Sequence, residues 1–226
     1  MARILRSAAG DIVYHILNRA NGREQIFQKE KDYEAFTKIL FGAKEKYPMR
    51  ILSFCIMPNH WHFVLYPKTG QDLSNFMRWI THTHTQRYHS HYKSIGYGHV
   101  YQGRYKSFPI EKDNHFLQAC RYVEKNPLRA GLCKMVQDWK WSSLWIREQG
   151  NKEQKKLLSD WPLEMPISYL EWVNTLEKDE EDKLQKIRYA LKRGCPYGKE
   201  SWIKKTAEKL NLISTLIPRG RPKKGT

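Results

Sequence analysis

The run MPNHWHFVLYP, residues 57–67, is the stretch that decides how this chain folds. After a Pro-Asn turn it is rich in aromatic and β-branched residues, which is typical of a β-strand. Side chains of a strand alternate between two faces, so His60 and His62 share one face and Trp61 lies on the other. Two imidazoles on one side of a rigid strand are suited to hold a metal ion. The pattern fits equally well two half-exposed strand histidines without a ligand.

The segments around this run predict a sheet with helices. Alternating or β-rich patterns predict strands over residues 11–18, 50–57 and 98–110, and helical spacing predicts helices over 31–47, 73–88 and 113–126. The resulting order is strand, helix, strand, strand, helix, strand, helix. This order is typical of an α+β structure with a ferredoxin-like antiparallel sheet, and we expect the helices to pack on one face of it.

The charge of the chain is strongly positive and unevenly distributed. Its 226 residues carry 40 Lys and Arg against 23 Asp and Glu, a formal net charge of +17. Residues 1–150 have a net charge of +11, residues 151–182 of −5, and residues 183–226 of +11. We therefore expect a basic domain, an acidic connector and a basic extension. Such an imbalance indicates a polyanionic partner.

The cysteines and the N-terminus indicate where such a protein works. The four cysteines are scattered without C-x-x-C spacing, which predicts neither a zinc knuckle nor a disulfide framework, and Cys55 and Cys120 are expected to be reduced core residues. Residues 1–11 lack the apolar stretch of a signal peptide, and no apolar run reaches membrane-spanning length. We expect a cytoplasmic protein without a membrane partner.

A second informative stretch is NHFLQACRYVEKNPLRAGL, residues 114–132. Tyr122 and Asn126 are four residues apart, so on a helix they project together. A phenol and an amide side by side could serve metal-dependent phosphoryl transfer, the first as nucleophile and the second as metal ligand. From spacing alone, a helix tyrosine is more often a packing residue. The direction of Asn126 is less fixed, because the following proline disfavours helical backbone there.

Together, MPNHWHFVLYP and RYVEKNPLRAGL resemble the motifs of the HUH single-tyrosine transposases, and more closely those of the REP-associated tyrosine transposases. The order agrees as well: a histidine pair, a long helix, the segment QGRYKS at residues 102–107, and then a tyrosine helix ending in N-P-x-R-A-G. The resemblance covers about residues 8–145. It implies a catalytic domain over residues 1–150, followed by the acidic connector and a DNA-binding extension over 183–226.

The resemblance also implies the site. His60 and His62 would bind a divalent metal ion, Mg²⁺ or Mn²⁺ in this family, although imidazoles favour Mn²⁺ over Mg²⁺. Tyr122 would be the nucleophile. Asn126 occupies the position of a third, polar ligand, and Glu124 is the alternative for that role. No general base is evident beside the tyrosine.

The implied activity is that of a transposase. The enzyme would nick and rejoin single-stranded or hairpin, REP-like DNA through a covalent phosphotyrosine, which conserves the bond energy for rejoining. We expect a monomer rather than a dimer that exchanges tyrosine helices. The main alternative is a domesticated, sequence-specific DNA-binding protein without strand-transfer activity. A rolling-circle replication initiator or relaxase is a third hypothesis, disfavoured by the small domain and the lack of a helicase region.

Two segments are candidates for DNA contacts. The first mixes stacking and phosphate-binding groups in Arg104, Tyr105 and Lys106, although an ordinary amphipathic strand would have the same pattern. The second is the PRGRPKK end, where Arg219 and Arg221 resemble the arginines of an AT-hook that enter a minor groove. A merely cationic tail is the alternative there.

Overall fold

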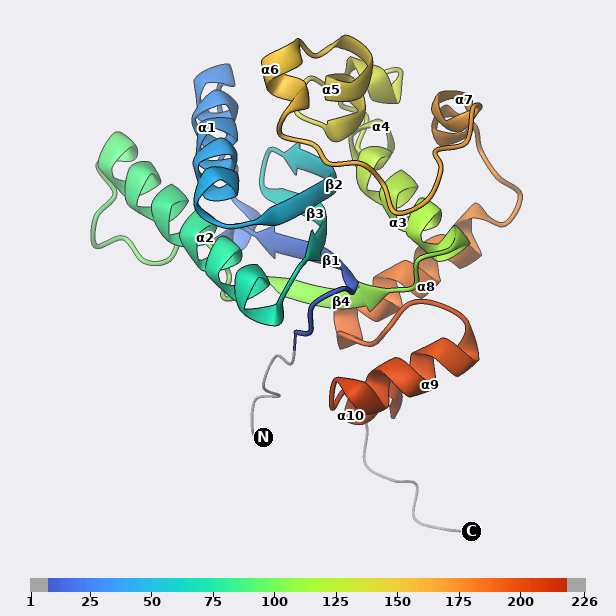
Figure 1. The fold of residues 1–226 in the computed structure, drawn as a ribbon. Coiled ribbons are helices and arrows are strands. Elements are labelled where there is room, and N and C mark those ends of the chain that lie inside the picture. The colour runs from blue at the N-terminus through green and yellow to red at the C-terminus, as the bar shows by residue number, and fades with distance from the viewer. Residues whose placement is uncertain (1–7, 219–226) are drawn as a thin grey trace.

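A four-stranded antiparallel sheet lies at the centre of the computed structural model, which describes residues 8–218 (Figure 1). The strand order is β2-β3-β1-β4, so the histidine strand is an inner strand between β2 and β1. The strands are β1 (Val13–Arg19), β2 (Met49–Met57), β3 (His60–Pro67) and β4 (Lys106–Ile110).

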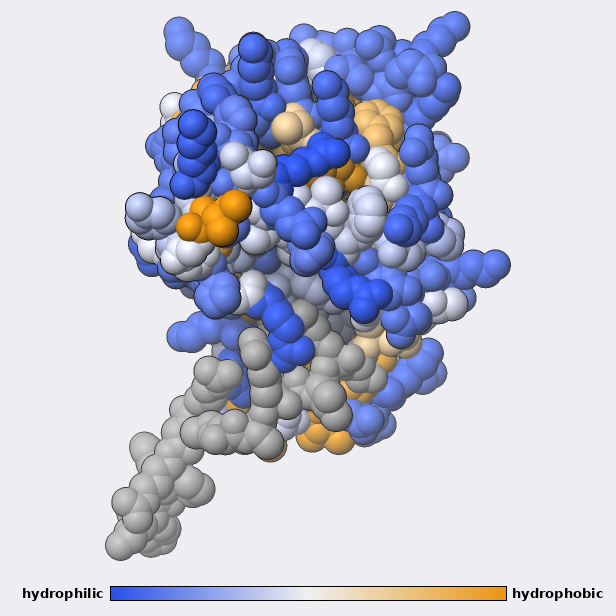
Figure 2. Space-filling view, turned by 90° about the vertical axis from the view of Figure 1, so that its left-hand side faces the viewer, coloured by the Kyte–Doolittle hydropathy of each residue, from blue (hydrophilic) through white to orange (hydrophobic). Residues whose placement is uncertain are grey.

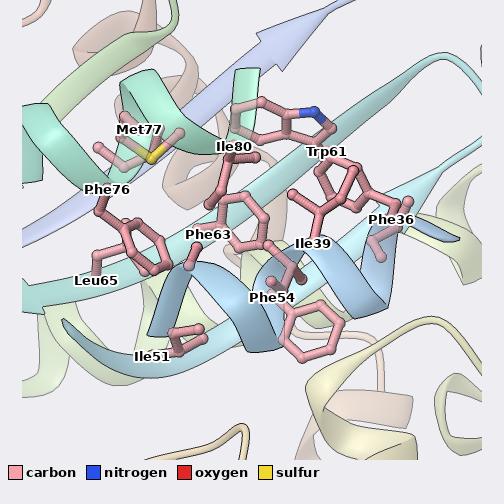
Figure 3. Packing of buried hydrophobic residues seen from close by; sticks show 14 of the residues in the cluster. Phe36, Ile39, Ile51, Phe54, Trp61, Phe63, Leu65, Phe76, Met77 and Ile80 are labelled. Carbon is pink, nitrogen blue, oxygen red and sulfur yellow. The ribbon is translucent and has the colours of Figure 1, made fainter. Parts of the chain in front are cut away.

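Two helices complete a β-α-β-β-α-β unit with these strands. They are α1 (Glu30–Lys46) and α2 (Gly70–Tyr92), and both lie on one face of the sheet (Figure 1). Order and pairing confirm the predicted α+β, ferredoxin-like class. The core between these helices and the sheet is strongly aromatic (Figure 3), and it includes Phe36, Phe54, Trp61, Phe63, Phe76 and Ile80.

The opposite face of the sheet is covered as well, by α3 (Asn114–Glu124), which contacts β2 and β3. The expectation that helices pack on one face therefore holds for α1 and α2 but not for the tyrosine helix. α3 covers this second face because the strands are apolar there too, and burial of apolar side chains is favourable. Leu52 and Val64 are examples of these side chains. Cys55 and Cys120 are buried, free thiols in this second core, as predicted.

The chain after α3 forms short helices that extend the second core. Side chains of Tyr169, Val173, Leu184 and Ile187 enter it, so parts of the acidic connector and of the extension pack against the tyrosine helix and the sheet. The division into three domains stays a prediction. The α-helices are α4 (Asn126–Arg129), α5 (Ser143–Gln149), α6 (Lys152–Lys155), α7 (Tyr169–Asn174), α8 (Glu180–Arg193), α9 (Glu200–Lys209) and α10 (Ile213–Leu216), and the 3₁₀ turns are Asn21–Arg23 and Val136–Asp138.

The predicted strand over residues 98–110 is shorter in the structure. Its second half forms β4, whereas its first half is a loop that contacts the sheet through an isolated bridge between Tyr101 and Ala20. Gly98 and Gly103 have φ angles of 101° and 152°, a backbone conformation that regular strands do not adopt. The glycines therefore interrupt the strand.

The surface on the side of α1 and α2 is largely hydrophilic, with separated hydrophobic residues (Figure 2). Across residues 8–218, the helices are too short or too polar for any of them to cross a membrane.

One histidine of α2 is buried. His84 is only 5% exposed and its Nδ1 lies 2.6 Å from the Tyr101 hydroxyl. Burial lowers the pKa of His84 to about 3. The ring is therefore neutral in the folded protein at neutral pH.

Replacing His84 by Gln should make the protein less sensitive to acid. In the unfolded chain the imidazole takes up a proton near pH 6.5, whereas the folded protein excludes it until about pH 3. The free energy of unfolding therefore falls as the pH drops below 6.5, and at pH 5 this residue accounts for a loss of about 2 kcal/mol. Urea denaturation at pH 7 and pH 5 would measure the difference. An equal loss in wild type and His84→Gln would contradict a buried, neutral imidazole.

Candidate active site

The helix that carries Tyr122 is defined by a polar side chain at each end. At its start, the Asp113 carboxylate accepts a hydrogen bond from the backbone N–H of His115 at 2.9 Å. At its end, the Asn126 amide nitrogen donates to the carbonyl oxygens of Tyr122 and Val123, at 3.0 and 3.3 Å. These bonds pair backbone groups at the two ends of a short helix.

A buried ionic cluster fixes the same helix against the acidic connector. Arg121 and Lys125 project from α3 and donate to Oε2 of Glu180, at 3.1 and 2.9 Å. Both also donate to the carbonyl oxygen of Thr175, and Arg121 forms a further ion pair with Glu177. The two buried cations share the same few acceptors. The position of α3 therefore depends on the acidic residues Glu177 and Glu180.

Tyr122 lies beside the second histidine of the predicted pair, within the same chain. Its ring centroid is 5.7 Å from that of His62, in an edge-on arrangement, and 5.9 Å from that of His15 on β1. The guanidinium of Arg129 sits 4.8 Å from the tyrosine ring centroid and donates to the Tyr122 carbonyl oxygen. The structure thus brings together a phenol, two imidazoles and a cation from three distant segments of sequence.

Both histidines of β3 have one ring nitrogen engaged. His60 Nδ1 lies 2.6 Å from Oδ1 of Asn59, and His62 Nδ1 lies 2.8 Å from Nε2 of His15. The Nε2 atoms of His60 and His62 are therefore the ones left for a ligand, and the ring centroids are 5.1 Å apart. An engaged Nδ1 is the usual arrangement of a metal-binding histidine, since the second bond fixes the ring. These residues fit a divalent metal ion.

The protonation states of these rings also suit metal binding. Burial, with a contribution from Arg19, lowers the pKa of His60 to about 4. Burial likewise lowers the pKa of His62 well below its usual value and that of His15 to about 3. All three imidazoles are thus neutral at pH 7, the form that binds metals.

The two candidates for a third ligand are placed differently. Asn126 uses its amide nitrogen to close α3, which leaves the oxygen as the atom that could bind a metal ion. Glu124, the alternative, is fully buried and its carboxylate oxygens already accept four side-chain bonds. The structure therefore argues against Glu124 as a ligand. Its partners are Ser53, Ser143, Arg147 and Tyr169.

Sequence reasoning missed three residues of this site, namely His15, Asn59 and Arg129. Asn59 and Arg129 stood inside the quoted motifs, so their proximity to the site was a signal that could have been used. His15 offered none, because its place beside His62 depends on the antiparallel pairing of β1 with β3, in which Leu17 is opposite His62.

A different cluster could hold a metal ion by distance alone. Ligand atoms of Glu111, Asp113 and His115 lie within 4.8 Å of one another, among the described residues. Asp113, however, already caps α3, accepts from His115 Nδ1 at 2.8 Å and pairs with Lys199 at 3.2 Å. We therefore interpret this cluster as a helix-capping network.

The predicted DNA-binding residues of the loop before β4 border an open hollow of about 710 Å³. Arg104 and Tyr105 line it from the loop, and Arg78 and His82 line it from α2. Arg104 and Lys106 are exposed. Arg219 and Arg221 of the AT-hook-like end lie outside the described residues.

Comparison with known proteins assigns this arrangement to a family. Residues 8–126 match the family model described as "Transposase IS200 like". Because the match covers more than half of the sequence, the chain belongs to the IS200-like transposases.

Two relatives agree with this assignment. The chain is 23% identical over 135 residues to the REP-associated tyrosine transposase of Escherichia coli (strain K12), which covers 59% of this chain and 76% of that protein. It is also similar in fold to a solved REP-associated tyrosine transposase bound to a REP hairpin, with a TM-score of 0.51, 18% identity, and coverage of 74% of this chain and 99% of the other. The resemblance that the two motifs indicated is confirmed.

Removing the shared acceptor of the ionic cluster should destabilise the protein. In Glu180→Gln, Arg121 and Lys125 stay buried with one charged acceptor less, which we expect to cost about 3 kcal/mol of unfolding free energy. Glu181→Gln on the same turn of α8 is the matched control, because its pair with Arg188 is exposed and should contribute less than about 1 kcal/mol. Urea denaturation would compare the two, and equal losses would contradict the assigned role of Glu180.

Proposed function

We propose that this chain is a metal-dependent DNA endonuclease and strand transferase that nicks and rejoins single-stranded or hairpin DNA through a covalent bond to Tyr122. The observation that carries the proposal is the position of the Tyr122 ring, 5.7 Å from the ring of His62. Family membership supports the general class, since the chain is an IS200-like transposase. The neutral state of the histidines supports a role as metal ligands rather than as buried cations.

The reaction step is a transesterification. The Tyr122 hydroxyl loses its proton and its oxygen forms a bond to phosphorus, while the bond from phosphorus to the departing sugar oxygen breaks. The sugar oxygen takes up a proton and leaves as a hydroxyl, so the step has no net change in protons. Attack of that hydroxyl, or of another strand's hydroxyl, on the phosphotyrosine reverses the step. The phenol is a good leaving group because its ordinary pKa of about 10 lies below that of a sugar hydroxyl. Arg129, above the tyrosine ring, is placed to balance negative charge near the phenol.

His60 and His62 would hold the metal ion through Nε2, with the oxygen of Asn126 as the third ligand. When bound, a divalent ion such as Mg²⁺ or Mn²⁺ polarises the scissile phosphate and balances its charge. The chain contributes the rigidity of this site: Asn59 and His15 fix the two rings, and the fold of α3 fixes Asn126.

The proposed substrate and assembly rest on separate observations. A relative of similar fold is described as bound to a REP hairpin, which supports hairpin DNA as the partner here. Arg104 and Tyr105, which line the hollow at α2, and Lys106, which follows them in the chain, would contact unpaired bases and phosphates. Because Tyr122 lies next to His62 of its own chain, the arrangement supports a monomer that acts without exchange of tyrosine helices.

Replacing Tyr122 by Phe should abolish the covalent protein–DNA adduct while hairpin binding changes less than about twofold, since only the nucleophilic oxygen is lost. Denaturing gel electrophoresis with labelled hairpin DNA measures the adduct, and a mobility-shift assay measures binding. Tyr66→Phe is the matched control, because Tyr66 is a similarly buried tyrosine in the second core. An adduct formed by Tyr122→Phe would contradict the assignment of Tyr122 as the nucleophile. Hairpin binding by wild type with no adduct would favour the DNA-binding hypothesis.

Chelation of divalent metal should stop adduct formation, and so should loss of a ligand. We expect EDTA to abolish the adduct and added Mn²⁺ or Mg²⁺ to restore it, and we expect His60→Ala to lower the rate by at least about 100-fold. His91→Ala, which changes an exposed histidine of α2 outside the lining of the hollow at that helix, should retain the wild-type rate. A full rate in EDTA, or in His60→Ala, would contradict the metal site.

A further inference from the structure

His15 contacts more of the site than the His62 ring that it fixes. It lies in the middle of β1, is fully buried, and stacks on Phe108 of the neighbouring strand with ring centroids 4.8 Å apart. Its Nε2 lies 2.8 Å from Nδ1 of His62, and its ring lies at 71° to that of Tyr122 with centroids 5.9 Å apart. The His15 ring thus packs on Phe108 and contacts both His62, a proposed metal ligand, and Tyr122, the proposed nucleophile.

Two neutral imidazoles joined by one hydrogen bond have only two proton arrangements. In the first, His15 Nε2–H donates to His62 Nδ1, and the proton of His62 sits on Nε2. In the second, His62 Nδ1–H donates to His15 Nε2, and the Nε2 of His62 carries a free lone pair. A metal ion can bind only the second arrangement, because it needs that lone pair.

The other nitrogen of His15 distinguishes these states energetically. His15 Nδ1 is buried and has no hydrogen-bond partner within the described part of the chain. In the first arrangement this atom is a bare acceptor, whereas in the second it is an unpaired N–H. Since orphaned buried N–H groups are rarer in proteins than under-satisfied acceptors, the metal-free protein should favour the first arrangement.

We propose that His15 is a positioning residue whose tautomer is coupled to that of His62, so that binding of a divalent cation at His62 moves both protons together. The proposal rests on the proposed function in taking His62 Nε2 as the metal-binding atom. His15 orients the His62 ring through its hydrogen bond, and this orientation outweighs the cost of leaving its own N–H unpaired when the cation binds. No net proton is gained or lost when the two rings switch.

Nitrogen NMR of ¹⁵N-histidine-labelled protein tests the coupling directly and without any DNA cleavage. In the metal-free protein we expect His62 and His15 both to carry their protons on Nε2. Saturation with Zn²⁺, a diamagnetic probe, should move both protons to Nδ1. If metal-free His62 already carries its proton on Nδ1, or if the His15 tautomer is unchanged by Zn²⁺, the proposal is overturned.

Mn²⁺ affinity, measured by EPR titration, provides the second test. His15→Phe removes the partner of His62 Nδ1 and should weaken Mn²⁺ binding by about 10- to 100-fold. His15→Gln retains a carbonyl oxygen that can accept from His62 Nδ1–H, and its affinity should lie closer to wild type than that of His15→Phe. His84→Phe is the matched control, because His84 is also buried and hydrogen-bonded but packs against α1 in the first core. The Mn²⁺ affinity of this variant should equal that of the wild type.

The outcomes separate this inference from the proposed function. Wild-type affinity in a folded His15→Phe would overturn the role of His15 whatever the enzyme does. If His15→Phe fails to fold, the NMR measurement on wild type and the Gln variant still decide the matter. Tautomers and Mn²⁺ affinities as expected, in a protein that never forms a DNA adduct, would support the inference and reject the proposed nuclease activity.

Discussion

The alternation of side chains along β3 is the constraint on which the rest of the structure depends. Trp61 and Phe63 point into the aromatic core under α1 and α2, whereas His62 and Val64 point into the core under α3. Trp61 donates to the Tyr101 hydroxyl at 3.0 Å, which fixes the strand from the first side. A shift of β3 by one residue in the sheet register would move every side chain to the opposite face. The register that buries Trp61 in the first core is therefore the one that directs His62 toward α3.

The tyrosine helix depends on contacts from outside the sheet. With eleven residues, α3 is too short to be a stable helix alone. Arg121, and Lys125 at its C-terminal end, are buried charged residues, and burying them without partners would cost free energy. Glu180 and Thr175 supply those partners from the connector. Glu124 plays the equivalent part on another side of the helix, where Arg147 balances its charge. Charged residues of the later chain, Glu180 and Arg147, thereby determine where the helix that carries Tyr122 lies.

Local pattern was sufficient for β1 to β3 and for α1 to α3, because these elements follow from periodicity. The roles of His60, His62 and Tyr122 stay predictions, which rest on contiguous motifs and on the family resemblance of those motifs. Local pattern was insufficient wherever the partner comes from elsewhere in the chain. Nothing near Glu124 in sequence indicates a hydrogen bond to Tyr169, 45 residues later. His15 likewise gains its meaning from strand pairing. The glycines that delay the start of β4 were visible in the sequence, but their positive φ angles were not.

The electrostatic balance of the site connects these observations. The histidines proposed as its ligands are neutral, because burial lowers their pKa values. Arg129 adds a largely desolvated positive charge near the Tyr122 ring, where burial lowers the guanidinium pKa and the tyrosine opposes that shift. Glu124 is the acid on the same stretch of α3, and its charge is already balanced by Arg147. A centre of this kind, with a divalent cation added, has excess positive charge and little internal compensation. Such a centre would therefore bind an anionic ligand more strongly than it binds neutral water. A phosphodiester is an anion of this kind.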